Sequence, residues 1–154
     1  MKFALLFVLT GFMSLGLADQ KTYELSLTDI NGQQQTLSQY RGKWVIINYW
    51  STTCPPCVKE MPELSAFHKQ HKDKDAVVIG VNFEDISIIW IKEFFNRVAV
   101  DYPIWLAGAS PFTPFGKIIA LPTTFIITPD GQVAGRHTGA ITKQALDIFI
   151  KENK

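Results

Sequence analysis

Apolar residues fall into two kinds of run along this chain, and the two kinds alternate. Residues 44–50 (WVIINYW) are almost continuously apolar, which is typical of a central strand buried on both faces. Residues 76–83 have the same character, and residues 103–106 predict a further short strand. The stretch between 83 and 103 predicts a helix with one buried face, because four of its apolar residues recur at helical spacing: Ile91, Phe94, Phe95 and Val98.

An Asn31-Gly32 pair marks a turn near the start of the folded region. Residues 23–27, which precede it, alternate weakly and predict an edge strand. The turn closes this strand into a hairpin or loop with residues 33–37.

A second hairpin is predicted near the end of the chain, where the turn residues at 129–131 (PDG) separate two extended runs, 123–128 and 132–136. A last amphipathic helix over 142–151 is expected to direct four apolar residues inward: Ala145, Leu146, Phe149 and Ile150. Strands that alternate with helices imply an α/β fold with helices packed on a central mixed β-sheet. The closing hairpin makes part of that sheet antiparallel.

The first 18 residues differ in character from the rest. Lys2 provides a positive charge, and the uncharged, largely apolar run 3–17 follows it. We expect a signal peptide over residues 1–18, cleaved after Ala18, and one domain over 19–154. The alternative is an uncleaved membrane anchor, although the run falls short of the roughly 20 residues that span a bilayer. Both readings place the domain in the periplasm or otherwise outside the cytoplasm, with membrane contact only if the segment stays uncleaved.

Composition narrows the class of protein further. The chain has 154 residues, of which 47% are hydrophobic, and this fits one globular domain with a sizeable core but no second catalytic domain. Fifteen basic and 14 acidic residues give a net charge of +1 and form no long basic stripe. We therefore expect no nucleic-acid partner.

The only two cysteines, Cys54 and Cys57, directly follow the predicted central strand and enclose two prolines. Proline is tolerated in a first helical turn, so a helix is predicted to begin here and to run to about His71. The positive end of its dipole stabilises a thiolate at Cys54, and the thiolate is the species that attacks disulfides. Cys57, one turn deeper, then attacks the mixed disulfide and releases the reduced substrate.

Two other uses of the cysteines are less favoured. A structural disulfide across Cys54 and Cys57 would close a very small loop and constrain the unfolded chain little. A zinc site of the four-cysteine kind needs a second pair of cysteines, which the chain lacks. We expect neither a metal nor a cofactor.

Taken together, the motifs resemble those of the TlpA/ResA branch of the thioredoxin-like family, over about residues 24–152. The resemblance is carried by Trp50-Ser-Thr-Thr-Cys54-Pro-Pro-Cys57, by Glu60 and Pro62, and by Leu121-Pro122-Thr123-Thr124-Phe125. It implies a thioredoxin-like fold and an exported thiol-disulfide oxidoreductase that reduces disulfide-containing proteins. It further implies a membrane thiol electron donor and, as one use, cytochrome c maturation.

The resemblance also implies roles for individual residues. Pro122 is expected to be a cis-proline facing the two cysteines and, with Leu121 and Trp50, to bind substrate. Glu60 is expected to tune the cysteines. Its spacing alone allows a carboxylate near the buried thiol that handles its proton, or an acid that merely complements the helix dipole.

Two positions depart from the family pattern. Asn48 stands where many thioredoxins place a buried aspartate, so a proton relay here would rely on Glu60 or water. Thr53 replaces the tryptophan usually found before the first cysteine, which leaves the rim of the site smaller and more polar. Substrate preference therefore does not carry over directly from the family.

The direction of the reaction is predicted from Pro55 and Pro56. They remove two backbone amides that would otherwise bond the Cys54 thiolate, which favours the disulfide form and makes the pair reducing. A disulfide oxidase or isomerase is the alternative that uses the same residues. A peroxidase ranks last, because Ser51 fits the pattern it requires before the cysteine and Ile47 does not.

Histidines raise two metal hypotheses. A copper chaperone on the same fold would use both cysteines and His137, but such proteins typically have three residues between the cysteines rather than two. His68 and His71 have a spacing that suits a pair of metal ligands. A solvated helix end, favoured by the dipole, is the interpretation we prefer for them.

Overall fold

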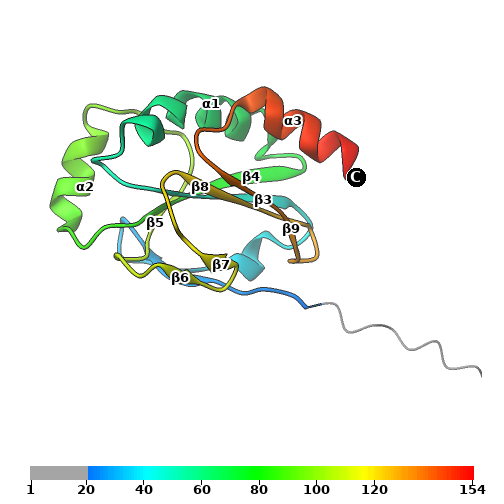
Figure 1. Cartoon of the computed structure of the whole chain (residues 1–154), viewed down its shortest axis with the longest axis horizontal. Helices are drawn as coiled ribbons and strands as arrows, with labels where there is room; N and C mark the ends of the chain where they lie inside the picture. Colours follow the sequence, from blue (N-terminus) through cyan, green and yellow to red (C-terminus); the bar gives the residue numbers. More distant parts are fainter. Residues whose placement is uncertain (1–20) are drawn as a thin grey trace, which may run out of the picture.

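The computed structural model describes residues 21–154, so the predicted signal peptide lies outside the described residues. A seven-stranded mixed sheet with the order β2-β1-β5-β4-β3-β8-β9 forms the centre of the fold (Figure 1). The helices are α1 (Pro55–His71), α2 (Ile88–Phe95) and α3 (Lys143–Glu152), with a 3-10 helix η1 (Leu37–Tyr40). The strands are β1 (Ser26–Asp29), β2 (Gln34–Thr36), β3 (Trp44–Trp50), β4 (Ala76–Asn82), β5 (Ile104–Leu106), β6 (Phe112–Thr113), β7 (Gly116–Lys117), β8 (Thr123–Ile127) and β9 (Val133–Thr138).

The two central strands are the ones that the longest apolar runs predict. All seven residues of β3 and all seven of β4 are buried, and the strands pair in parallel from Trp44 beside Ala76 to Trp50 beside Asn82. Parallel strands buried on both faces read as continuous apolar runs. On its other side β3 pairs antiparallel with β8, which continues into β9. The predicted α/β fold with a mixed sheet is confirmed.

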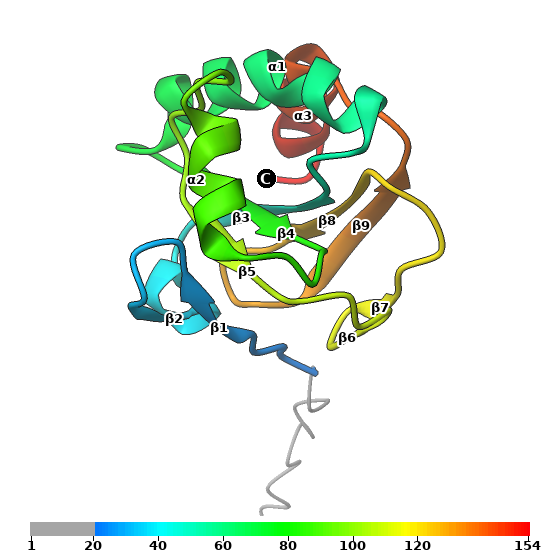
Figure 2. The ribbon, with the colours of Figure 1, turned by 90° about the vertical axis from the view of Figure 1, so that its left-hand side faces the viewer.

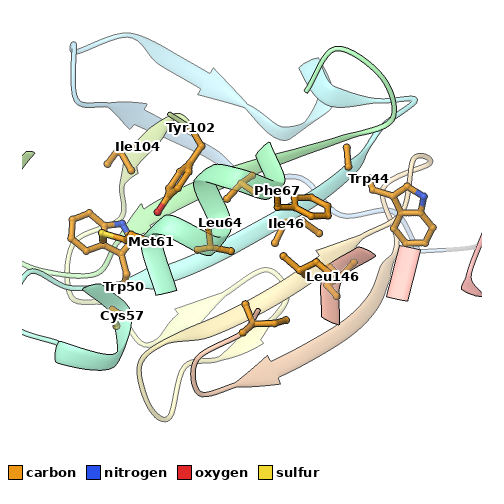
Figure 3. Packing of buried hydrophobic residues seen from close by; sticks show 14 of the residues in the cluster. Trp44, Ile46, Trp50, Cys57, Met61, Leu64, Phe67, Tyr102, Ile104 and Leu146 are labelled. Carbon is orange, nitrogen blue, oxygen red and sulfur yellow. The ribbon is translucent and has the colours of Figure 1, made fainter. Parts of the chain in front are cut away.

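Apolar side chains on the two faces of the sheet form two core clusters. On one face, Met61, Leu64 and Phe67 of α1 pack with Ile46 and Trp50 of β3 (Figure 3). Residues of α2 and α3 join the same cluster. Each fully buried side chain of this size contributes roughly 1.5–3 kcal/mol. This cluster fixes α1, and with it the two cysteines, on the sheet.

The opposite face is covered without a long helix. Leu37 of η1 and Ile118, which follows β7, pack there with sheet residues such as Trp105. Figure 2 shows β6 and β7 on the far side of the sheet from α1 and α3. The sequence did not predict this small hairpin, because strands of two residues are too short to show a hydrophobic period.

Both predicted hairpins are present, with shifted boundaries. Gly32 adopts a φ of 81° in the turn between β1 and β2, which pair antiparallel. The first strand begins three residues later than predicted. Gly131, with a φ of 91°, closes the β8–β9 hairpin, and β9 continues to Thr138 rather than ending at Arg136. Glycine suits both turns because it has no Cβ to oppose a positive φ.

Two details of the predicted helices are wrong. The helix α2 ends at Phe95, so Val98 lies beyond it, and of the four predicted residues only Ile91 and Phe94 are buried. In α3, Leu146 and Ile150 are buried and Phe149 packs partly buried against the same core cluster, as predicted, whereas Ala145 is exposed.

The two histidines at the end of α1 are not solvated, so that interpretation is wrong. His68 is buried, its Nδ1 atom accepts a hydrogen bond from the Val78 amide at 3.1 Å, and burial lowers its pKa. The ring of His71 stacks on Phe67 at 4.4 Å. Its two nitrogens lie 2.7 Å from a carboxylate oxygen of Asp75 and 2.9 Å from one of Asp147. Both rings therefore join α1 to neighbouring elements.

The described residues, 21–154, were expected to contain neither a membrane span nor a metal site. No helix in this part of the chain is both long and apolar enough to cross a membrane. Within the same residues, no three or more His, Cys, Asp and Glu side chains are grouped so that they could hold a metal ion.

Candidate active site

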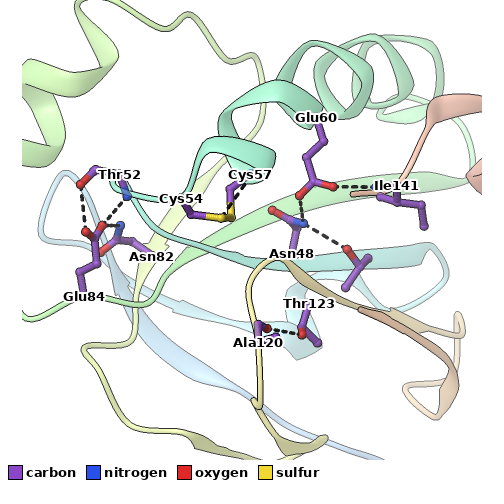
Figure 4. The surroundings of a disulfide bond; sticks show 11 residues. Asn48, Thr52, Cys54, Cys57, Glu60, Asn82, Glu84, Ala120, Thr123 and Ile141 are labelled. Atoms are coloured by element: carbon purple, nitrogen blue, oxygen red, sulfur yellow. Dashed lines mark hydrogen bonds between the residues drawn. A yellow bond between two sulfur atoms is a disulfide. The ribbon is translucent and has the colours of Figure 1, made fainter. Parts of the chain in front are cut away.

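The two cysteines lie where β3 ends and α1 begins, and they form a disulfide bond (Figure 4). Cys54 is the N-cap residue of α1 and is half-buried, whereas Cys57 is completely buried. The buried run of β3 delivers the chain to this point, and the helix dipole places its positive end at the Cys54 sulfur. The pair therefore has one sulfur that a partner can reach and one that is enclosed.

Backbone donors to the Cys54 sulfur are few. Pro55 and Pro56 occupy the first two positions of α1 and have no N–H group, as predicted. The Cys57 amide is the one that donates to the Cys54 Sγ atom, at 3.3 Å. This remaining donor was not predicted from the sequence, whereas the two missing amides were.

Glu60 is buried beneath the helix rather than exposed in its first turn. Its side chain is 2% exposed, and its two oxygens accept hydrogen bonds from Asn48 Nδ2 and from the Ile141 amide, both at 2.8 Å. Burial raises the pKa of the Glu60 carboxyl to about 7, although these two hydrogen bonds act in the opposite direction. An acid that merely complements the helix dipole would be solvated, so that reading of Glu60 is wrong.

Asn48 links Glu60 to the sheet. It lies in the middle of β3, is 1% exposed, and its Nδ2 atom also donates to Thr124 Oγ1 of β8 at 3.1 Å. The departure from the family pattern at this position thus supplies a neutral donor. That donor positions the buried Glu60 carboxyl group, one helical turn from Cys57.

The Leu121–Pro122 peptide bond is cis, as the family resemblance implies. It precedes β8, and the carbonyl of Pro122 accepts a hydrogen bond from the Gly139 amide at 2.9 Å. Pro122 is buried, whereas Leu121 is partly buried and packs against both core clusters, one of which contains Cys57. The role of these two residues in binding substrate stays a prediction.

Trp50 is enclosed in the core rather than exposed beside the cysteines, so the expectation that its side chain binds substrate is wrong. Its side chain has 0% exposure and packs against Phe94 and Phe95 of the α2 helix, with ring centroids 5.4 Å apart in both pairs. The reason is the burial of β3 on both faces, which directs its last side chain into the core.

A carboxylate that the sequence did not single out holds the loop before Cys54. Glu84 accepts hydrogen bonds from the amide and the hydroxyl of Thr52 and from the side chain of Asn82 (Figure 4). Thr52 and Glu84 are 32 residues apart in sequence. Only the adjacency of the carboxyl ends of β3 and β4 brings them together, and no local motif signals it.

His137 does not complete a copper site with the cysteines. Its Nε2 atom lies 3.2 Å from the carbonyl oxygen of Ala140, and its side chain is exposed on β9. Within residues 21–154, the two cysteines and His137 are not grouped so that they could hold a metal ion.

Known proteins with similar sequences and folds point to one family. The AhpC/TSA family model matches residues 18–136. The thiol-disulfide oxidoreductase ResA of Halalkalibacterium halodurans is 31% identical over 139 residues, which are 90% of this chain and 78% of the relative. Both matches include the two cysteines.

Solved structures agree on the fold. A DsbF homologue from Corynebacterium diphtheriae has a TM-score of 0.75 at 24% identity, over 92% of this chain and 97% of that one. A secreted thiol-disulfide isomerase from Corynebacterium glutamicum has a TM-score of 0.72 at 22% identity, over 85% of this chain and 84% of that one. With its disulfide at the start of α1 and its cis-proline before β8, the chain belongs to the AhpC/TSA family and is a ResA-like thiol-disulfide oxidoreductase with a thioredoxin-like fold.

Proposed function

We propose that this enzyme reduces disulfide bonds in exported proteins, with Cys54 as the attacking thiol and Cys57 as the resolving thiol. The observation that carries the proposal is the difference between the two sulfurs. Cys54 is half-buried at the N-terminus of α1, where the dipole and the Cys57 amide favour its thiolate, and Cys57 is enclosed.

The reaction proceeds in two exchanges. The Cys54 thiolate attacks one sulfur of the substrate disulfide, forms a mixed disulfide and releases the other substrate sulfur as a thiolate. The Cys57 thiolate then attacks the Cys54 sulfur, which forms the Cys54–Cys57 disulfide and releases the second substrate thiolate. The substrate gains two electrons and the enzyme loses two. A membrane thiol donor returns them by the same exchange in reverse.

Glu60 is the proton acceptor that we assign to Cys57. It follows Cys57 by one helical turn, where side chains on the same helix meet, and both residues are buried. A carboxyl group with a pKa of about 7 changes its protonation in the range where the enzyme operates. Asn48 and the Ile141 amide hold the carboxylate in place, so the proton has a fixed destination when Cys57 is activated.

Pro122 and Leu121 bind an extended segment of the substrate in this proposal. Their support is the cis bond ahead of β8 and the partial exposure of Leu121 beside the cluster that contains the cysteines. We place the enzyme outside the cytoplasm on the strength of the signal-like pattern over residues 1–18. Maturation of cytochrome c is one use that the family resemblance supports.

The reduction potential separates a reductase from an oxidase or isomerase. We expect the Cys54–Cys57 couple to lie nearer thioredoxin, at about −270 mV, than the oxidant DsbA, at about −120 mV. The physical reason is that Pro55 and Pro56 leave the Cys57 amide as the donor to the Cys54 sulfur. Equilibration with glutathione, followed by alkylation and mass measurement, gives the potential. A value above roughly −170 mV would identify an oxidant.

A further inference from the structure

The loop that carries Cys54 is held from the neighbouring strand by one carboxylate. Glu84 Oε2 accepts from the Thr52 amide at 2.6 Å and from Asn82 Nδ2 at 2.8 Å, while Oε1 accepts from the Thr52 hydroxyl at 2.9 Å. Three donors converge on the two oxygens of this side chain, which is the arrangement that a carboxylate can accept.

The position of this contact in the fold ties it to the reacting sulfur. Trp50 and Asn82 are paired as the last residues of β3 and β4, and the Phe83 amide donates to the Trp50 carbonyl at 2.8 Å. Glu84 therefore continues the contact between the two strands beyond their last paired residues, because it accepts the hydrogen bond of the Thr52 amide. Cys54 follows Thr52 by two residues, and its amide donates to the Ser51 carbonyl at 3.3 Å, so Glu84 ties the turn that carries the reacting sulfur to the neighbouring strand.

We propose that Glu84 is a positioning residue of the thiol-disulfide exchange. It fixes the loop so that the Cys54 sulfur stays at the N-terminus of α1. Its negative charge opposes the thiolate there and keeps the pair from becoming strongly oxidising. The inference rests on the proposed function, since it takes Cys54 as the attacking thiol.

Other charged groups lie on the elements around Cys54 and must be separated from Glu84 in a test. Lys59 and Glu60 are on α1, and Lys117 is the one charged residue between positions 102 and 122. Asp85 is the closest comparison, because it is the next residue in the chain and its Oδ1 atom holds a neighbouring loop through the Ala109 amide at 3.2 Å. It makes no bond to Thr52 among those between described residues.

The experiment measures the pH profile of Cys54 alkylation by iodoacetamide in the reduced full-length protein, with the modified cysteine identified by mass spectrometry. We expect Glu84→Gln to lower the midpoint of the profile by about half a pH unit or more, since a negative charge near the thiolate is removed. The control Asp85→Asn removes a negative charge from the same loop. We expect it to change the midpoint of the profile much less than Glu84→Gln does.

A second variant tests the positioning part without changing charge. Thr52→Val keeps the amide but loses the hydroxyl that bonds Glu84, and we expect insulin reduction to slow about threefold or more at an unchanged midpoint. Thr52→Ser keeps the hydroxyl, so we expect it to reduce insulin at the rate of the parent protein.

Each contrary result would overturn one part of the proposal. An unchanged midpoint in Glu84→Gln, or equal shifts in Glu84→Gln and Asp85→Asn, would overturn the charge effect of Glu84. A parental rate in Thr52→Val would overturn its positioning of the loop. Faster alkylation of Cys57 than of Cys54 in the parent protein would instead overturn the proposed function, so the two failures are distinguishable.

Discussion

A Cys57→Ala variant is expected to stop after the first exchange and to retain its substrate as a mixed disulfide on Cys54. The enclosed Cys57 sulfur is the group that attacks this intermediate, and no other cysteine exists in the chain to replace it. Catalysed insulin reduction should fall to the uncatalysed background. The adduct is measured on a non-reducing gel, and its partner and its attachment to Cys54 are identified by mass spectrometry.

The matched control is Cys54→Ala, which keeps the buried thiol and removes the reachable one. We expect this variant to form no adduct, because Cys57 has 0% exposure. The reverse result, adducts on Cys57 in Cys54→Ala and none in Cys57→Ala, would show that the roles of the two thiols are exchanged.

The second large effect concerns Glu60 and the stability of the disulfide form. Burial raises the pKa of Glu60 from 4.5 to about 7 in the folded protein. Its contribution to stability is therefore fully present below about pH 4.5 and is lost as the pH rises through about 7, because the folded state holds the proton more tightly. At 1.36 kcal/mol per pKa unit, this contribution amounts to about 3 kcal/mol.

Glu60→Gln keeps a neutral group in the same volume and removes this titration. Between about pH 5 and about pH 8, the free energy of unfolding of the parent should change relative to that of the variant by about 2–3 kcal/mol, with the parent losing stability as the pH rises. Denaturant unfolding of the oxidised proteins at the two pH values measures it. The buried His68, whose pKa is lowered, titrates in both proteins and cancels in the comparison.

Glu63→Gln is the control for this experiment. Glu63 lies three residues further along the same helix, is exposed, and accepts a hydrogen bond from the Lys143 amide at 2.9 Å. We expect its variant to follow the parent at both pH values. If Glu60→Gln also followed the parent, the pKa of the Glu60 carboxyl would not be raised toward neutral pH, and its assignment as the proton acceptor for Cys57 would lose its basis.

The elements that the sequence predicts best are those whose local pattern has one explanation. The limits of β3 coincide with the run 44–50, because a strand buried on both faces leaves a continuous apolar signal. The start of α1 follows from Pro55 and Pro56, which fit a first helical turn and few other places. These two elements suffice to place Cys54 at a helix N-terminus.

What the sequence could not predict depends on partners that are distant along the chain. Glu84 meets Thr52 only because β3 and β4 pair in register, and His71 meets Asp147 only because α3 packs beside α1. Polar residues such as His68 look solvated when read alone, since a buried hydrogen-bond partner such as the Val78 amide leaves no local pattern. Trp50 was wrongly expected to bind substrate because it lies close to the cysteines in sequence. Its side chain is buried, as are all the side chains of β3.

The central claim is that a single reachable sulfur at the entrance of α1 is already activated when the protein is reduced. Competitive alkylation at about pH 7, with limiting iodoacetamide and a free cysteine peptide in the same tube, tests it directly. We expect Cys54 to be modified first and several-fold faster than the peptide, while Cys57 stays unmodified. Modification of both thiols at no more than the pace of the peptide would contradict it.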